Sequence, residues 1–144
     1  MFLITDKPLE PQALVAGATS VEDGAVAVFL GVVRRHSRGK TVLYLEYEAY
    51  KEMAEAVLCQ IGDEVKERWP IGQVAIHHRV GRLEIGETSL VVVVTSPHRV
   101  EAFEACRHAV ERVKAIAPIW KKEVWEDGES WVEGNDLVVE RLGQ

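Results

Sequence analysis

Three lysines lie close together in the segment KAIAPIWKKE, residues 114–123. Lys114 comes near the end of a segment whose apolar residues recur at helical spacing, and Pro118 stops that helix. Lys121 and Lys122 follow the break. Closely placed cations repel each other unless an anion joins them, and a crowded lysine has its pKa lowered toward the range useful for catalysis. The segment therefore predicts a site for an anionic ligand at a chain reversal.

The side chains after the break should alternate, because an extended chain points successive residues to opposite faces. Lys121 then shares one face with Ile119, whereas Trp120 and Lys122 share the other. Lys114 lies at the border between the apolar stripe of its helix and solvent, so it and Lys121 can converge. The alternative is that these lysines only favour the negative end of a helix and lie over aromatic residues.

Two further groups of basic residues stand at the ends of predicted elements. His98 and Arg99 lie in SPHR, where a buried strand ends and a helix begins, and a helix N-terminus favours bound anions. Arg34 ends the segment FLGVVR, where it can hold phosphate by two parallel hydrogen bonds, and Gly31 permits a close backbone approach. Each group also has an ordinary explanation, as a helix cap with a solvated Arg99 or as an Arg34 at a sheet edge in water.

Charge is unevenly distributed along the chain, which has 17 basic and 23 acidic residues and a net charge of -6. Residues 34–40 hold four Lys/Arg and no acid, and residues 98–122 hold six Lys/Arg and three Glu. An acidic molecule with two local basic segments fits a small anion better than a nucleic acid or an anionic membrane. A rival interpretation, a nucleic-acid contact through RRHSRGK, predicts binding that weakens steeply with salt.

Several familiar sites are absent from the sequence, including G-x-x-x-x-G-K-[ST], G-x-G-x-x-G, G-x-S-x-G and H-E-x-x-H. Cys59 and Cys106 form no C-x-x-C pair. His77 and His78 are adjacent on a predicted strand, so they point to opposite faces and cannot share a metal. We therefore expect no metal site and interpret both histidines as ordinary strand residues. The lack of a long apolar run and of a signal-peptide pattern predicts a cytoplasmic protein without a membrane span.

Hydrophobic periodicity predicts a single α+β domain over residues 1–144, with a mainly antiparallel sheet. Strands are expected at 2–5, 24–34, 41–50, 73–83 and 88–97, helices at 7–18, 51–69 and 100–117, and a hairpin at 119–134. The apolar stripes of the two long helices include Met53 and Phe103. Trp125 and Trp131 are expected to pack across the final hairpin.

Several segments, taken in order, are similar to those of one known family. They are GAVAVFLGVVR, YLEYEAYKEMA, HRVGRLEIGE, SPHRVEAFEA, VKAIAPIWKKE and WVE, and together they run from Gly24 to Glu133. On these segments the chain resembles the large, catalytic subunit of molybdopterin synthase. The resemblance implies an α+β domain of the α/β-hammerhead kind, with two long helices packed on the sheet.

The resemblance also implies a sulfurtransferase of molybdenum cofactor biosynthesis. In this family the subunit forms a homodimer, and one small ubiquitin-like sulfur-carrier subunit binds at each end to give a heterotetramer. The carrier's C-terminal Gly-Gly is activated as a thiocarboxylate, which enters a pocket of the large subunit. Its sulfur passes to cyclic pyranopterin monophosphate, and two transfers with opening of the cyclic phosphate form the dithiolene of molybdopterin. No cofactor or metal is implied beyond these substrates.

Site residues are carried over from the resemblance position by position. Lys114 and Lys121 match the two lysines regarded as catalytic in similar proteins. The other substrate-binding positions of the family fall on Val32, Val33, Arg34, His98, Arg99, Lys122 and Glu123. We expect the two arginines and the histidine to hold the pterin and its phosphate. The two catalytic lysines would steer the thiocarboxylate, stabilise developing negative charge and shuttle protons.

One departure from the family pattern follows WVE, where some members carry a further Arg that is thought to reach the neighbouring subunit's pocket. Gly134 and Asn135 stand at that place, and Arg141 is a substitute that the alignment leaves unassigned.

A different class of protein also stays open at this point. The same basic pocket would suit a non-catalytic module that captures a partner's C-terminal carboxylate without chemistry. Partner binding that survives loss of Lys114 and Lys121 would favour that interpretation.

Overall fold

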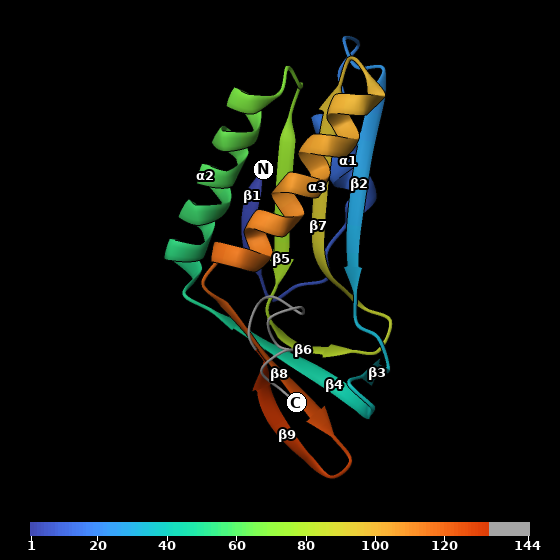
Figure 1. Ribbon diagram of the computed structural model, residues 1–144, viewed down its shortest axis with the longest axis vertical. Helices are drawn as coiled ribbons and strands as arrows, with labels where there is room; N and C mark the ends of the chain where they lie inside the picture. The colour runs from blue at the N-terminus through green and yellow to red at the C-terminus, as the bar shows by residue number, and fades with distance from the viewer. Residues whose placement is uncertain (133–144) are drawn as a thin grey trace.

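The structure is a computed structural model, and it describes residues 1–132 (Figure 1). Its elements are β1 (Phe2–Thr5), α1 (Pro11–Ala18), β2 (Ala25–Val32), β3 (His36–Ser37), β4 (Lys40–Ala49), α2 (Lys51–Arg68), β5 (Val74–Arg79), β6 (Gly81–Glu84), β7 (Thr88–Ser96), α3 (Arg99–Ile116), β8 (Ile119–Trp125) and β9 (Gly128–Val132). Strands and helices form an α+β fold, which confirms the predicted class. Both long helices begin and end within one residue of their predicted bounds.

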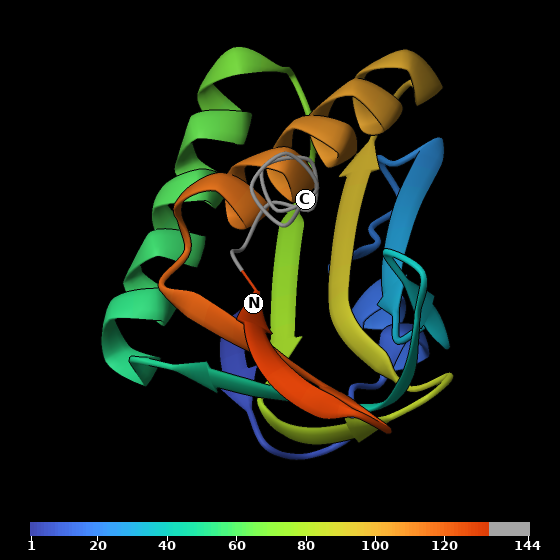
Figure 2. The same ribbon diagram turned by 60° about the horizontal axis from the view of Figure 1, so that its bottom comes forward.

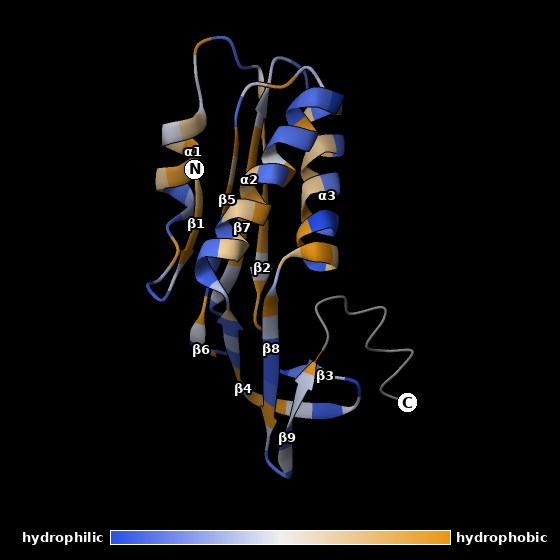
Figure 3. Cartoon of the chain, turned by 90° about the vertical axis from the view of Figure 1, so that its left-hand side faces the viewer, coloured by the Kyte–Doolittle hydropathy of each residue, from blue (hydrophilic) through white to orange (hydrophobic). Residues whose placement is uncertain are grey.

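The first sheet has the strand order β1-β5-β7-β2. β1 runs parallel to β5, and the other neighbouring strands are antiparallel. β7 is central because its sequence, TSLVVVVTS, is apolar on both faces, and every residue after the first is buried. Figure 3 shows β5 and β7 largely in hydrophobic colours, whereas the middle of β8 is hydrophilic.

Helices cover both faces of this sheet. α2 and α3 lie side by side on one face, and α1 packs on the other (Figure 1). The buried faces of the two long helices consist mainly of Ala54, Leu58, Ile61, Val65, Ala102, Ala105, Ala109 and Val113. The predicted stripes were wrong at Met53 and Phe103, which are 58% and 68% exposed. The small neighbours Ala54 and Ala102 face the core in their place, because they permit a close approach to neighbouring elements that a large side chain would prevent.

The single strand predicted at 73–83 is two strands in two different sheets. β5 pairs with β7, whereas β6 pairs with β4 in the second sheet. The chain changes sheet at Gly81, whose φ of 91° lies in the left-handed region that glycine adopts without strain. Periodicity did not reveal this break because apolar residues continue through it.

The second sheet has the order β3-β4-β8-β9, with β6 also paired to β4, and all its pairs are antiparallel. It comes forward at the bottom of the molecule in Figure 2. Its own small core contains Val33, Val42, Leu45 and Leu83, with Trp125 packed against them. The prediction that Trp125 and Trp131 pack across the hairpin was wrong. Trp131 lies opposite Lys122 and is exposed, so the two tryptophans occupy opposite faces.

The connection from α3 to β8 joins the two parts of the fold. α3 ends at Ile116, and the next residue, Ala117, is already extended because Pro118 disfavours helical backbone before it. β8 then starts at once, at Ile119. The last turn of α3 and the first half of β8 therefore lie together at the junction of the two sheets, as Figure 1 shows.

Candidate active site

A cavity lies at this junction and is lined by residues from both sheets and from the end of α3. One part of it is lined by Gly31, Tyr47, His78, Ser89, Leu90, Val113, Lys114, Ala117, Ile119 and Lys121. An adjoining part shares Gly31, Tyr47, Ser89 and both lysines and adds, among others, Arg34, Ser37 and Glu123. Seven elements, β2, β3, β4, β5, β7, α3 and β8, thus contribute to one hollow, which no local segment could form alone.

Lys114 and Lys121 both line this cavity, as the sequence predicts. Lys114 is in the last turn of α3, and Lys121 follows the reversal on the same side of β8 as Ile119. Tyr47 of β4 is the residue directly opposite Lys121 in the strand pairing, and it lines the cavity too. The two lysines place positive charge beside a phenol at the wall of a small hollow, which suits an anionic ligand.

His78 is a cavity residue that the sequence interpretation missed. Its side chain is buried, with 6% of the residue exposed, and its ring meets Tyr47 edge-on at 4.9 Å between centroids. Its Nδ1 lies 2.7 Å from the carbonyl oxygen of Arg79. A carbonyl oxygen only accepts, so Nδ1 carries the proton and Nε2 keeps a lone pair. The available signal was the alternation of His77 and His78, which places one of the two on the α3 side of β5.

Burial lowers the pKa of His78 to about 4; the hydrogen bond to the Arg79 carbonyl opposes this, and the charge of Lys114 adds to it. The imidazole is therefore neutral at pH 7, and the cavity's positive charge stays on its lysines and arginine. His77, on the other face of the strand, has a pKa lowered mainly by burial and also by the charged N-terminus.

Arg34 stands where the chain leaves the first sheet for the second. Val33, just before it, is 2% exposed and held by two backbone hydrogen bonds, from its N–H to the Glu87 carbonyl at 2.9 Å and from the Gly86 N–H to its own carbonyl at 2.7 Å. Val32, by contrast, has an exposed side chain. Val32 and Val33, predicted as substrate-binding positions, both line the cavity, and the backbone hydrogen bonds of Val33 hold the chain next to Arg34.

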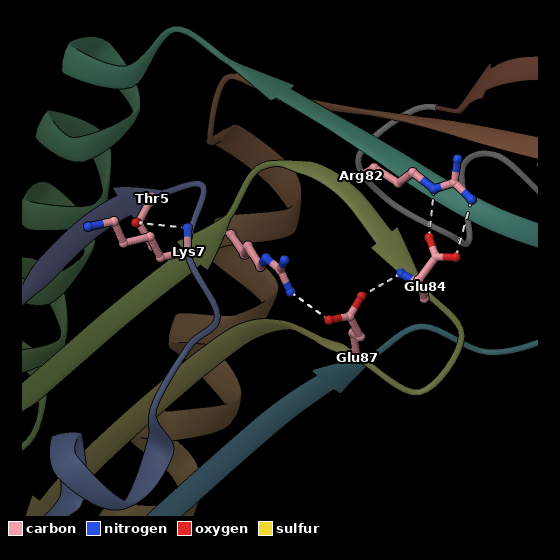
Figure 4. Close-up of polar contacts among 6 residues, drawn as sticks. Thr5, Lys7, Arg82, Glu84 and Glu87 are labelled. Atoms are coloured by element: carbon pink, nitrogen blue, oxygen red, sulfur yellow. Dashed lines mark hydrogen bonds and ion pairs between the residues drawn. The ribbon is translucent and has the colours of Figure 1, made fainter.

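The turn that holds Val33 is itself braced by charged groups (Figure 4). Glu87 accepts hydrogen bonds from the Glu84 backbone N–H at 2.7 Å and from Arg79 at 2.8 Å, which lower the pKa of its carboxyl. Arg82 donates to Glu84 at 2.7 Å in the same turn. Arg79 thus has two roles. Its guanidinium stabilises the turn that holds Val33 next to Arg34, and its carbonyl oxygen accepts a hydrogen bond from Nδ1 of His78.

A β-bulge shapes the opposite wall of the cavity. The pairing of β2 with β7 shifts between Gly31 and Val32, so that Ser89 has no direct partner in β2. The Ser89 hydroxyl donates to the Gly31 carbonyl at 3.2 Å. A side chain at Gly31 would meet Leu90 and Ser89 atoms at 3.3 Å, which explains a glycine at this close approach.

Lys122 points away from the cavity, as the alternation predicts. It donates to Glu46 at 2.9 Å, which raises its pKa, and lies 3.8 Å from Glu129. Its ammonium also lies over the ring of Trp131, at 5.5 Å from the centroid. These contacts bind β4, β8 and β9 together on the outer face of the second sheet.

The structure does not bring His98 and Arg99 to this cavity within one chain. They stand at the start of α3, whereas Lys114 is in its last turn, 15 residues after Arg99. At 1.5 Å per residue these positions are about 22 Å apart along the helix axis. His98 makes no side-chain cap, and its backbone N–H donates to the Ser96 hydroxyl at 3.3 Å.

The basic segment 34–40 is partly neutralised by neighbouring acids. Arg38 lies 3.6 Å from Glu123, and Lys40 donates to Asp127 at 2.9 Å. Lys40 also lies over the ring of Trp125. The segment therefore offers a nucleic acid fewer uncompensated charges than its sequence suggests.

Neither cysteine lines the cavity. Cys59 is exposed on α2, and Cys106 is buried in α3, where burial raises the pKa of its thiol to about 11. Within residues 1–132, no cluster of three His, Cys, Asp or Glu side chains can hold a metal ion. None of the helices in that same part of the chain is long and apolar enough to cross a membrane. The positions of Gly134, Asn135 and Arg141 lie outside the described residues.

Comparison with known proteins connects this arrangement to a family. Residues 4–116 match the family described as MoaE protein. The molybdopterin synthase catalytic subunit of Halalkalibacterium halodurans is 51% identical over 131 residues, which cover 91% of this chain and 84% of that protein. The corresponding subunit of Bacillus subtilis is 48% identical, over 91% of this chain and 83% of that protein. The chain belongs to the MoaE family.

Solved structures agree with this membership. Molybdopterin synthase from Staphylococcus aureus superimposes with a TM-score of 0.87 at 46% identity, covering 90% of this chain and 95% of that one. A MoaE protein from Burkholderia ambifaria gives a TM-score of 0.78 at 37% identity, over 98% and 96% of the two chains. The chain accordingly has the enzymatic function of a molybdopterin synthase catalytic subunit, in molybdenum cofactor biosynthesis.

Membership in the MoaE family gives the cavity its context. Of the nine residues carried over, six line the cavity in one chain: Val32, Val33, Arg34, Lys114, Lys121 and Glu123. Lys122, His98 and Arg99 lie elsewhere in the chain. The cationic residues that line the cavity, Arg34, Lys114 and Lys121, are therefore gathered near the C-terminal end of α3.

Proposed function

We propose that this chain transfers sulfur from the C-terminal thiocarboxylate of a small ubiquitin-like carrier subunit to cyclic pyranopterin monophosphate. The observation that carries the proposal is the convergence of Lys114 and Lys121 on one cavity with Arg34 at its rim. Both substrates are anions, and two anions repel each other. Cations from three segments of the chain offset that repulsion while the sulfur and the pterin carbon approach.

The residues divide by position. Arg34, on the β2 side, suits the phosphate because its guanidinium can make two parallel hydrogen bonds to it. Lys114 and Lys121, beside Tyr47, suit the thiocarboxylate and the negative charge that develops as sulfur leaves the carrier's carbonyl carbon. In each transfer a C–S bond forms on a pterin side-chain carbon as that carbon's C–O bond breaks, which releases a phosphate oxygen in one transfer and water in the other. Water then cleaves the C–S bond to the carrier and restores its carboxylate. Lysine ammonium groups are placed to supply and recover the protons.

The proposal includes a homodimer with one carrier subunit at each end. Since His98 and Arg99 lie about 22 Å along α3 from Lys114, they can serve the same substrate only from a second copy of the chain. A solved complex of subunits 1 and 2 of molybdopterin-converting factor from Helicobacter pylori has this fold, with a TM-score of 0.73 at 22% identity. Its two-subunit composition supports the expectation of a carrier partner here.

Lys122 has a different part in the proposal. Its ammonium is engaged by Glu46 on the outer face of the sheet, so it acts on the ligand through the alignment of β8. That alignment places its neighbour Lys121 in the cavity.

A single-turnover reaction tests the proposed function. The purified chain, a thiocarboxylated Gly-Gly carrier and cyclic pyranopterin monophosphate are mixed, and the products are followed by mass spectrometry. The expected product has gained two sulfur atoms and has an opened cyclic phosphate. A carrier that binds but delivers no sulfur would instead support a module that only captures a C-terminal carboxylate. The same carrier ending in an ordinary carboxylate is the matched control.

A further inference from the structure

Glu123 is a carboxylate in the wall of an otherwise cationic cavity. It is 3% exposed, and the part of the cavity that it lines also contains Arg34, Lys114 and Lys121. A negative charge at this place opposes the binding of an anion, unless that charge is already engaged by partners of the protein itself. The contacts of Glu123 show that it is.

Both oxygens of Glu123 accept hydrogen bonds from side chains of the chain. Oε2 accepts from the Ser37 hydroxyl at 2.9 Å, and Oε1 accepts from the Trp125 indole N–H at 3.0 Å. The guanidinium of Arg38 lies 3.6 Å from Oε1. Ser37 and Arg38 belong to the β3–β4 hairpin, so these contacts join segments that are 86 residues apart. Hydrogen bonds to a buried carboxylate are among the stronger ones in proteins.

The turn of this hairpin carries a residue that its backbone does not favour. Arg38 and Gly39 lie between the paired residues Ser37 and Lys40, and their φ angles are 51° and 76°. Two positive φ angles are typical of a type I′ turn, in which Asn, Asp or Gly usually takes the first position. An arginine there is costly for the backbone. The contact of its guanidinium with Glu123 explains why an arginine stands at this position.

The hairpin in turn determines where Arg34 stands. On one side Val33 is fixed to the β6–β7 turn, and on the other the Arg35 carbonyl accepts from the Val42 N–H at 2.6 Å. Ser37, two residues further, is fixed by Glu123. Arg34 therefore lies in a short backbone span with both ends held, and one of the two holds depends on Glu123.

We propose that Glu123 is a positioning residue that anchors the β3–β4 hairpin to β8 through Ser37 and Arg38, and thereby holds Arg34 at the cavity. It does not itself contact the substrate. Its effect on catalysis rests on the proposed function, because Arg34 acts there on the phosphate of the pterin. The anchor itself is a property of the fold and is testable without turnover.

Hydrogen exchange of the full chain, read by mass spectrometry over residues 34–42, tests the anchor. We expect Glu123→Ala, Ser37→Ala and Arg38→Asn to speed exchange there by about tenfold, with β7 unchanged. Arg38→Asn removes the guanidinium but keeps a residue suited to positive φ. Asp127→Asn, which removes only the exposed contact to Lys40, is the matched control and should change little.

The pattern across variants separates an anchor from a general loss of stability. The double variant Glu123→Ala with Ser37→Ala should exchange no faster than Glu123→Ala alone, because both changes remove one shared contact. Unchanged exchange over residues 34–42 in Glu123→Ala would overturn the proposal. If that variant does not fold, Ser37→Ala and Arg38→Asn decide the matter by the same measurement.

Kinetics then distinguish positioning from direct contact. For Ser37→Ala and Arg38→Asn we expect the KM for cyclic pyranopterin monophosphate to rise about tenfold, while the rate at saturation stays within about twofold. Glu123→Gln, which retains an acceptor for Ser37, should lie between these variants and the wild type. A Glu123→Ala rate defect at saturation, with no effect of Ser37→Ala or Arg38→Asn, would show direct contact instead. If the wild-type chain transfers no sulfur, the proposed function fails, and the exchange data still decide the anchor.

Discussion

His78 brings no positive charge to a cavity whose lysines supply that charge. Its Nδ1 proton is held by the Arg79 carbonyl, so the ring can only accept a further hydrogen bond through Nε2. A protonated imidazole beside Lys114 would add electrostatic repulsion. A neutral His78 therefore avoids repulsion with Lys114. Its lowered pKa also makes the free energy of unfolding depend on pH.

Stability should fall as the pH drops from about 6.5 to about 4. Burial lowers the pKa of folded His78 from 6.5 to about 4, so in this range the unfolded chain binds a proton that the folded chain does not. The contribution is fully present above pH 6.5 and is lost as the pH falls toward 4. At about 1.4 kcal/mol per pKa unit, the loss approaches about 3 kcal/mol.

Urea unfolding at pH 7 and pH 4.5 checks this prediction. The difference in unfolding free energy between the wild type and His78→Phe should shrink at the lower pH, because the variant has no imidazole to protonate when unfolded. His36→Gln, at an exposed position of the hairpin, is the matched control. An equal difference at both pH values would mean that His78 does not titrate as described.

Replacing either cavity lysine should remove most of the activity. We expect Lys114→Ala and Lys121→Ala each to lower the single-turnover rate by at least ~100-fold, because a preorganised charge next to the reacting group is lost. Lys51→Ala, an exposed lysine of α2, should leave the rate unchanged. Full turnover of Lys114→Ala at saturating partners would refute its chemical role.

At the scale of elements, two helix glycines differ in what surrounds them. A side chain at Gly62 in α2 would clash with the ring of Phe2. A side chain at Gly17 in α1 would meet nothing within 4 Å. The first glycine therefore permits β1 to lie against α2, whereas the second has no packing role.

Alanine at these two positions should have opposite effects. Gly17→Ala should raise the free energy of unfolding by about 0.5–1 kcal/mol, because alanine favours the helix. Gly62→Ala gains the same propensity but must displace Phe2, and we expect a net loss of about 1 kcal/mol. Thermal or urea unfolding of both variants measures the contrast. Equal stabilisation by both would show that Phe2 moves aside at no cost.

Elements were predicted well where one physical signal dominates and poorly where two compete. The long helices were predicted from the spacing of their apolar residues and from Pro70 and Pro118 beyond their ends. The convergence of Lys114 and Lys121 on one cavity was predicted from helix and strand geometry. The division of residues 73–83 into β5 and β6 was not predicted, because apolar residues recur on both sides of Gly81, at Ile76, Val80 and Leu83, and the chain changes sheet at that glycine. Phe103 was predicted to be buried because it is strongly hydrophobic. The packing of α3 requires a small residue instead, and Ala102 faces the core.

The site was predictable only in part for a related reason. Local sequence brought out the lysines at one reversal, but His78 reaches the cavity through the pairing of β5 with β7 and β1, which no local pattern reveals. The engagement of Glu123 likewise depends on a hairpin 86 residues earlier. His98 and Arg99 belong to the same basic segment of the sequence as Lys114, yet they lie at the opposite end of α3.

At the scale of the whole molecule, a mixing experiment tests whether two copies share a site. If the proposed homodimer forms, Arg99→Ala chains and Lys114→Ala chains should each be nearly inactive by themselves. When they are mixed and allowed to exchange subunits, half of the dimers contain one of each, and one of the two sites in these dimers is intact. Activity should then recover to about a quarter of the wild type.

Full activity of the Arg99→Ala chain by itself would place Arg99 outside the site. An inactive Arg99→Ala chain that shows no recovery, despite exchange shown by mass spectrometry, would mean that Arg99 does not act across the dimer. Lys51→Ala chains mixed with Lys114→Ala chains provide the matched control, since that mixture contains unaltered cavities from the start.

The buried thiol of Cys106 has a consequence for the order of events in turnover. The chain has two cysteines, one exposed on α2 and one inert in the core of α3, and neither reaches the cavity. The cavity thus has no cysteine thiol that could carry the sulfur between the donor and the acceptor. In the proposed reaction both partners must be bound at the same moment, so initial-rate plots at several carrier concentrations should intersect. Parallel lines, the mark of a ping-pong scheme, would require a sulfurated enzyme that this cavity has no cysteine to form.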